Sequence, residues 1–235
     1  MGESLHYDVS MSPLGRVGRA EFRVLPPDSM AVDYGVVFAS DVRAKVLFVV
    51  VHNVHRSWYD PEYGRTRGFV SNQRELGRSI KHDIRIDDRG RWNDAATGEK
   101  GQTQVDAPLD ELAFLYVVRE MPLPDGEEFA LHRHFRDADN PVRITVRGRE
   151  TLRVDTRDIR VIRLEVRFQP RRRFDSGGRV TLYLADDATR RLMRMDVDVP
   201  LVGHLKLELD AERSNYCREY EDQPFEGIRI VDAAE

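Results

Sequence analysis

Apolar and polar side chains alternate in many short stretches of this chain, and Gly, Pro, Asp and Asn separate the stretches. In a β-strand, alternation turns one face toward a core and the other toward water. Leu5, Tyr7 and Val9 follow this pattern near the start of the chain. Strands this numerous and evenly spaced favour an all-β fold, mainly an antiparallel meander curled into a barrel or half-barrel.

The expected strands are bounded by turn residues or by a loss of alternation. They cover residues 5–9, 17–24, 32–40, 44–52, 55–59, 66–74, 79–86, 129–135, 142–147, 151–155, 160–168, 180–185, 192–199 and 204–209. A hairpin is expected around residues 41–43, a polar loop over 93–106, and a tight turn at Asp186-Asp187.

One segment departs from the strand pattern. Residues 109–120 begin with acidic side chains and end with Arg119, which suits the dipole of a helix, and either Asp106 or Asp110 could cap its start. Apolar residues occupy nearly its whole circumference after Glu111. The pattern predicts one buried helix that packs against the sheet.

Length and composition fit a single folded β domain. The chain has 235 residues, of which 40% are hydrophobic and 33% are charged. We predict one domain over residues 1–212 and a polar C-terminal tail over residues 213–235. The longest apolar run, Val46 to Val51, is far shorter than the ~18 residues that a transmembrane helix needs. No transmembrane segment is expected, and the lone Cys217 excludes an intramolecular disulfide.

The overall charge gives no global field that points to nucleic acid, although local basic patches remain possible. The formal net charge is -4, so no nucleic-acid partner is expected. The sequence has no nucleophile elbow and no glycine-rich phosphate loop, and we predict no catalytic residue and no cofactor. His132 and His134 would share a strand face and are weak candidates for a metal site, but no third ligand is evident.

Aromatic residues in polar surroundings supply the candidate ligand contacts. Trp58, Tyr59 and Trp92 could line the mouth of a binding site, or could be ordinary core and sheet-face residues. Tyr116 and Arg119 of the predicted helix are expected as partners inside the sheet. These five residues are the predicted ligand-binding set.

Three stretches together resemble a bacterial family of unknown function, DUF3108. Gly2 to Val9 is similar to the family's entry strand, and Leu184 to Leu192 to its Ser-Asp-Asp turn, with Ala185 in the serine position. Asp110 to Arg119 resembles its Asp-Pro-Leu-Ser-Ala-Leu-Tyr-Tyr-Leu-Arg segment, in which Glu111 replaces the proline here. In the same segment Ala113 replaces the serine and Val117 the second tyrosine, and residues 202–207 are similar to the family's closing strand.

The resemblance implies an exported protein of the Gram-negative envelope with a barrel-like fold akin to lipid carriers, and no established reaction. Residues 1–4 lack the features of a secretion signal, so the signal peptide is expected to be absent from this sequence. The leading hypothesis is a non-enzymatic periplasmic binding or scaffold protein for a lipid or other amphipathic ligand. The alternatives are a structural subunit of an envelope complex, which docks an envelope protein through sheet edges or residues 171–178, and a metal-dependent hydrolase using His132 and His134.

Overall fold

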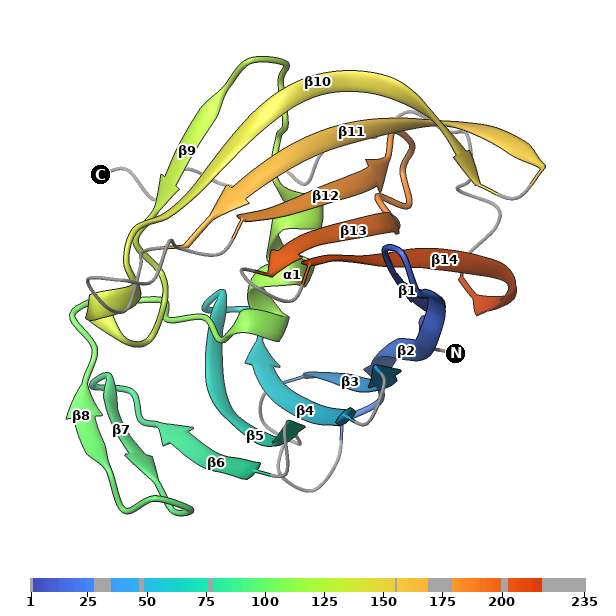
Figure 1. Ribbon diagram of the computed structural model, residues 1–235. Helices are drawn as coiled ribbons and strands as arrows, with labels where there is room; N and C mark the ends of the chain where they lie inside the picture. The colour runs from blue at the N-terminus through green and yellow to red at the C-terminus, as the bar shows by residue number, and fades with distance from the viewer. Residues whose placement is uncertain are drawn as a thin grey trace.

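The computed structural model describes residues 2–27, 35–46, 49–75, 78–154, 156–168, 179–199 and 203–216 (Figure 1). These residues form one sheet, whose strands are β1 (Ser4–Met11), β2 (Gly15–Leu25), β3 (Val36–Val46), β4 (Val49–Asp60), β5 (Arg65–Glu75), β6 (Arg78–Ile86), β7 (Arg91–Asp94), β8 (Lys100–Gln102), β9 (Glu128–Leu131), β10 (Val142–Val154), β11 (Arg157–Arg167), β12 (Arg179–Ala185), β13 (Leu192–Val199) and β14 (Gly203–Asn215). The helices among the described residues are α1 (Glu111–Glu120) and the short 3-10 helix η1 (Asp137–Asp139).

The sheet is an antiparallel meander that stays open. Each strand pairs with its neighbour in sequence apart from β8 and β9, and β1 also pairs with β14, which joins the two halves of the meander. In the described part of the chain, β8 and β9 are the two edges and do not pair with each other. The ribbon curls around α1, which lies in the hollow (Figure 1). The predicted all-β half-barrel with one buried helix is therefore confirmed.

The hollow of the sheet contains the core. In β1 the alternating Leu5, Tyr7 and Val9 are buried, as the sequence pattern predicts. They belong to one cluster with apolar residues of β10 to β14 and with Leu112 and Ala113 of α1. Because β1, β2, β3 and β10 to β14 contribute buried side chains to the same cluster as α1, the helix replaces the second sheet that a sandwich would need.

Asp110 caps the N-terminus of α1, which confirms one of the two predicted caps, Asp106 or Asp110. Its Oδ1 accepts hydrogen bonds from the backbone N–H of Leu112 at 2.9 Å and of Ala113 at 3.3 Å. These are donors that the first turn of a helix cannot satisfy by itself. Among the described helices, none is long and apolar enough to cross a bilayer.

Several expected boundaries are wrong. Residues 41–43 form no hairpin, because β3 continues through them and pairs on both sides, with β2 and with β4. The expected strands 142–147 and 151–155 are one strand, β10, whose register shifts at Gly148, where φ is +112°. The expected loop over 93–106 contains β8 and the end of β7. Long ladders carry polar residues that local patterns assign to turns.

The predicted tail begins too early. β14 extends to Asn215, and Ser214 is buried, where its hydroxyl accepts a hydrogen bond from the backbone N–H of His6 at 2.9 Å. Residues 213–215 therefore belong to the sheet. Cys217, the rest of the predicted tail and residues 171–178 lie outside the described residues.

Candidate ligand-binding site

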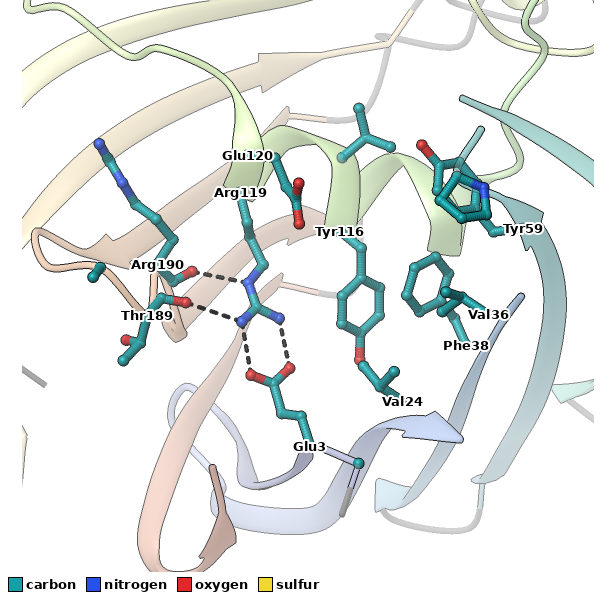
Figure 2. Close-up of a pocket in the computed structure, with 14 residues that line it drawn as sticks. Glu3, Val24, Val36, Phe38, Tyr59, Tyr116, Arg119, Glu120, Thr189 and Arg190 are labelled. Atoms are coloured by element: carbon teal, nitrogen blue, oxygen red, sulfur yellow. Dashed lines mark hydrogen bonds and ion pairs between the residues drawn. The ribbon is translucent and has the colours of Figure 1, made fainter. Parts of the chain in front are cut away.

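An open cavity of about 800 Å³ lies between the C-terminal half of α1 and the concave face of β2, β3 and β4 (Figure 2). Residues 2–3 and the turn at 188–190 complete its rim. Volumes of this order are typical of sites that enclose a small organic molecule.

One wall of the cavity is apolar. Strand register places Val24 opposite Phe38, and Val36 opposite Tyr59, so these side chains share one face of the sheet. Tyr116 of α1 stacks on Phe38, with ring centroids 4.1 Å apart and planes 5° apart. The stacked pair ties the helix to the sheet at the edge of the cavity.

The opposite end of the cavity is polar. The guanidinium of Arg119 donates to both carboxylate oxygens of Glu3 at 2.6 and 2.7 Å, and to the carbonyls of Arg190 and Thr189 at 2.9 and 3.2 Å (Figure 2). Burial lowers the pKa of Arg119, but the bidentate pair with Glu3 more than offsets this and raises it. The bidentate ion pair as a whole carries no net charge.

The hydroxyl of Tyr116 lies between these two regions. The residue is 8% exposed, and in the described part of the chain its hydroxyl has no hydrogen-bond partner. Its hydroxyl end points away from α1, toward the side of the cavity near Val24 (Figure 2). Burial, and to a lesser degree the nearby Glu3 carboxylate, raise the pKa of Tyr116, so the group remains an O–H donor. A buried donor without an acceptor is costly.

The structure brings three of the five predicted ligand-binding residues to this cavity: Tyr59, Tyr116 and Arg119. Trp58 is buried on the other face of the sheet, where it packs with Val37 beneath the guanidinium of Arg85, 4.7 Å from its ring. Adjacent residues in a strand point to opposite faces, so Trp58 and Tyr59 could not both line one concave site.

Trp92 also lies away from the cavity. It packs against the cluster of Phe69, Ile84 and Phe135 and meets Phe135 edge to face at 6.0 Å. A Cβ on Gly101 would lie 2.5 Å from its ring, so the strand beside it requires glycine there. The Trp92 side chain therefore packs β7 against its neighbours.

The two candidate metal histidines do not share a strand face. β9 ends at Leu131, so His132 and His134 lie in the segment after it, where His132 is exposed and His134 is buried. An isolated bridge between Leu109 and His134 holds this segment beside the start of α1. His134 therefore has different partners from those that the strand pattern predicts.

Sequence reasoning missed two groups of residues. Glu3, Thr189 and Arg190 reach the cavity only through the pairing of β1 with β14 and the turn after β12, and no local pattern marks them. The second group surrounds Asp110, whose Oδ2 accepts hydrogen bonds from the hydroxyls of Ser57 at 2.5 Å and Thr66 at 2.8 Å. Ser57 could have been found from the sequence, because polar side chains at every second position of its strand indicate a polar site on one face of the sheet.

Comparison with known proteins supports the fold. A family described as "Protein of unknown function (DUF3108)" matches residues 6–210. The chain belongs to this family. A solved structure similar to this DUF3108 protein is a β-barrel-like protein of domain of unknown function DUF1849 from Brucella abortus, with a TM-score of 0.57 and 13% identity over 88% of this chain and 95% of that one. At this identity the likeness concerns the fold alone. No functionally curated protein matches the chain.

Proposed function

We propose that this DUF3108 protein is a non-enzymatic binding protein of the bacterial cell envelope, and that the cavity beside α1 holds one amphipathic molecule such as a lipid. The observation that carries the proposal is the buried Tyr116 hydroxyl, which has no acceptor among the described residues and lies where an apolar wall meets a polar end. An acceptor on the ligand would satisfy this donor, while its hydrocarbon part covers Val24 and Phe38.

The charges around the cavity disfavour an anionic head group. Glu3 and Glu120 supply two carboxylates and Arg119 supplies one guanidinium group, whereas Arg190 presents its backbone carbonyl and its side chain points away (Figure 2). Arg119 is already engaged by Glu3 and two carbonyls. A zwitterionic or neutral head group with hydrogen-bonding oxygens therefore matches this end better than a simple anion does.

The envelope location rests on the family resemblance. The experiment that tests ligand binding also addresses this location. Protein purified from the periplasm of its own host, without removal of lipid, is analysed by native mass spectrometry and by solvent extraction. We expect a reproducible adduct whose extracted component has a hydrocarbon tail. Bare protein of calculated mass, with no uptake of the fluorescent apolar probe N-phenyl-1-naphthylamine, would reject the binding function.

A matched pair of variants locates the ligand. Val24→Trp fills the cavity beside Phe38, whereas Val54→Trp makes the same change at a 39% exposed valine that alternation places on the other face of the sheet. We expect the first variant to lose the adduct and the probe, and the second to retain both. Equal binding by the two variants, at comparable melting temperatures, would place the ligand elsewhere.

A further inference from the structure

A second cluster of polar side chains lies at the other end of α1, outside the ligand cavity. One ligand atom from each of His55, Asp110 and Glu111 lies within 4.8 Å of the others. The Nε2 of His134 lies 3.5 Å from Oε1 of Glu111. Two imidazoles and two carboxylates thus converge from β4, from the start of α1 and from the segment after β9.

The contact between His55 and Asp110 is close but poorly aligned for a hydrogen bond. The Nε2 of His55 is 3.0 Å from Oδ1 of Asp110, yet this buried nitrogen has no partner at hydrogen-bonding geometry among the described residues. Oδ1 meanwhile accepts from two backbone N–H groups of the helix. Two donor atoms side by side, with the imidazole nitrogen not aimed at the oxygen, are arranged like neighbouring ligands of one ion.

The spacing of the donor atoms fits a metal ion. Bonds of about 2.0–2.2 Å at tetrahedral angles place neighbouring ligand atoms about 3.3–3.5 Å apart. The contact of 3.5 Å between His134 and Glu111 falls in this range, and the 3.0 Å between His55 and Asp110 is slightly shorter. Among the described residues, the ligand atoms of His55, Asp110 and Glu111 all lie within 4.8 Å of one another, and His134 joins this group through its contact with Glu111.

Surrounding groups hold the donors in place. The hydroxyls of Ser57 and Thr66 fix Oδ2 of Asp110. The Nδ1 of His134 lies 3.4 Å from Oδ2 of Asp139, 3.3 Å from the carbonyl of Arg136, and 3.1 Å from the N–H of Arg136. Because the N–H of Arg136 donates to Nδ1, the proton of a neutral His134 lies on Nε2 and faces Glu111. A metal ion at Nε2 requires that proton to move to Nδ1, where the carboxylate of Asp139 or the carbonyl of Arg136 would accept it. Metal-binding histidines commonly have such a carboxylate or carbonyl partner.

We propose that His55, Asp110, Glu111 and His134 bind one divalent transition-metal ion of the zinc class. Imidazole nitrogen together with carboxylate oxygen suits Zn²⁺ and its neighbours, whereas Mg²⁺ and Ca²⁺ prefer oxygen ligands alone. The two carboxylates offset the positive end of the helix dipole. Access is through the half-exposed side chain of Glu111 and an apolar cavity of about 220 Å³ that His55 and Glu111 help to line.

Metal titration of the full-length protein tests the site. The protein is delipidated and stripped with a chelator, loaded with Zn²⁺ or Co²⁺, and passed through a desalting column before its metal content is measured. We expect about one equivalent of metal, and visible absorption from bound Co²⁺ typical of low coordination number. Because no amphipathic ligand is present, the result does not depend on the cavity described above.

Substitutions separate this site from surface binding. Glu111→Gln and His134→Gln should each weaken Zn²⁺ binding by about tenfold or more, since each removes a ligand. His132→Gln is the matched control, because His132 is exposed two residues from His134, and its affinity should equal that of the wild type. Circular dichroism checks that each variant is folded. Retention of well under one equivalent by the folded wild type, or equal weakening by His132→Gln and His134→Gln, would overturn the proposal.

Discussion

Asp110→Ala should destabilise the protein far more than the loss of an ordinary helix cap. A cap on a solvent-exposed helix contributes about 1 kcal/mol. Asp110 is fully buried, and its carboxylate accepts from two backbone N–H groups and from the hydroxyls of Ser57 and Thr66. The substitution removes four acceptor contacts at once at a buried site.

The magnitude follows from the fate of each donor. The helix N–H groups account for the usual ~1 kcal/mol of a lost cap. A buried hydroxyl left without an acceptor costs about 1–3 kcal/mol, and part of this is recovered if it rotates to another oxygen. Thr66 keeps one contact in any case, since its hydroxyl oxygen accepts from the backbone N–H of Asp110 at 3.1 Å. We expect a total loss of about 4 kcal/mol in the free energy of unfolding.

Urea unfolding in the presence of a chelator measures this loss without any contribution from metal. Asp110→Asn should lose about 2 kcal/mol, because it keeps Oδ1 as the helix cap but turns an NH₂ group toward the two hydroxyls. Asp137→Ala is the control: this exposed aspartate accepts one backbone hydrogen bond, from Gln104, and its loss should cost under about 0.5 kcal/mol. A loss near 1 kcal/mol for Asp110→Ala would show that the hydroxyl contacts contribute nothing, and would refute the reasoning.

Two further predictions concern other ionised groups. Glu3→Gln should lower the free energy of unfolding by about 2 kcal/mol, because Arg119 keeps its charge at a largely buried site with a weaker partner. In urea unfolding, the double variant Glu3→Gln with Arg119→Met should recover part of this loss. No recovery would argue that the ion pair does not contribute. The pKa of Asp94 is lowered from 3.8 to about 2, since hydrogen bonds from the N–H of Asp83, from His82 and from the N–H of Ala96 outweigh the opposing effect of burial. A lowered pKa contributes stability that is complete above about pH 4 and is lost as the pH falls toward 2. The free energies of unfolding of wild type and Asp94→Asn should therefore differ by about 2 kcal/mol above pH 4, and this difference should shrink as the pH falls to 2. A gap that stays constant from pH 6 to pH 3 would contradict this assignment.

The repeated alternation of side chains was enough to predict the strands and the half-barrel. Leu5, Tyr7 and Val9 are buried because a period of two leaves only one face for apolar groups, whatever the neighbouring strands are. The helix was equally predictable, since acidic residues at its start and apolar residues around its circumference suit a buried helix and no strand. Where the pattern failed, as at residues 41–43, pairing on both sides keeps polar residues in a strand.

The candidate sites depended on contacts that no local pattern contains. Tyr116 and Arg119 could be selected from the sequence, but their partners Phe38 and Glu3 are brought to them by the curl of the sheet and by the pairing of β1 with β14. His134 was selected for the wrong reason, since its neighbour in space is Glu111 rather than His132.

The sequence by itself thus determined most of the strands, the α-helix, and many of the side chains that face inward, because these follow from the local period of apolar residues. The tertiary structure decided which inward side chains meet. Val24, Phe38 and Tyr116 line one cavity because the curled sheet wraps around α1, and His55 meets Glu111 because β4 passes the start of that helix. Such meetings depend on strand register and curvature over the whole chain, which the period of any one segment does not specify.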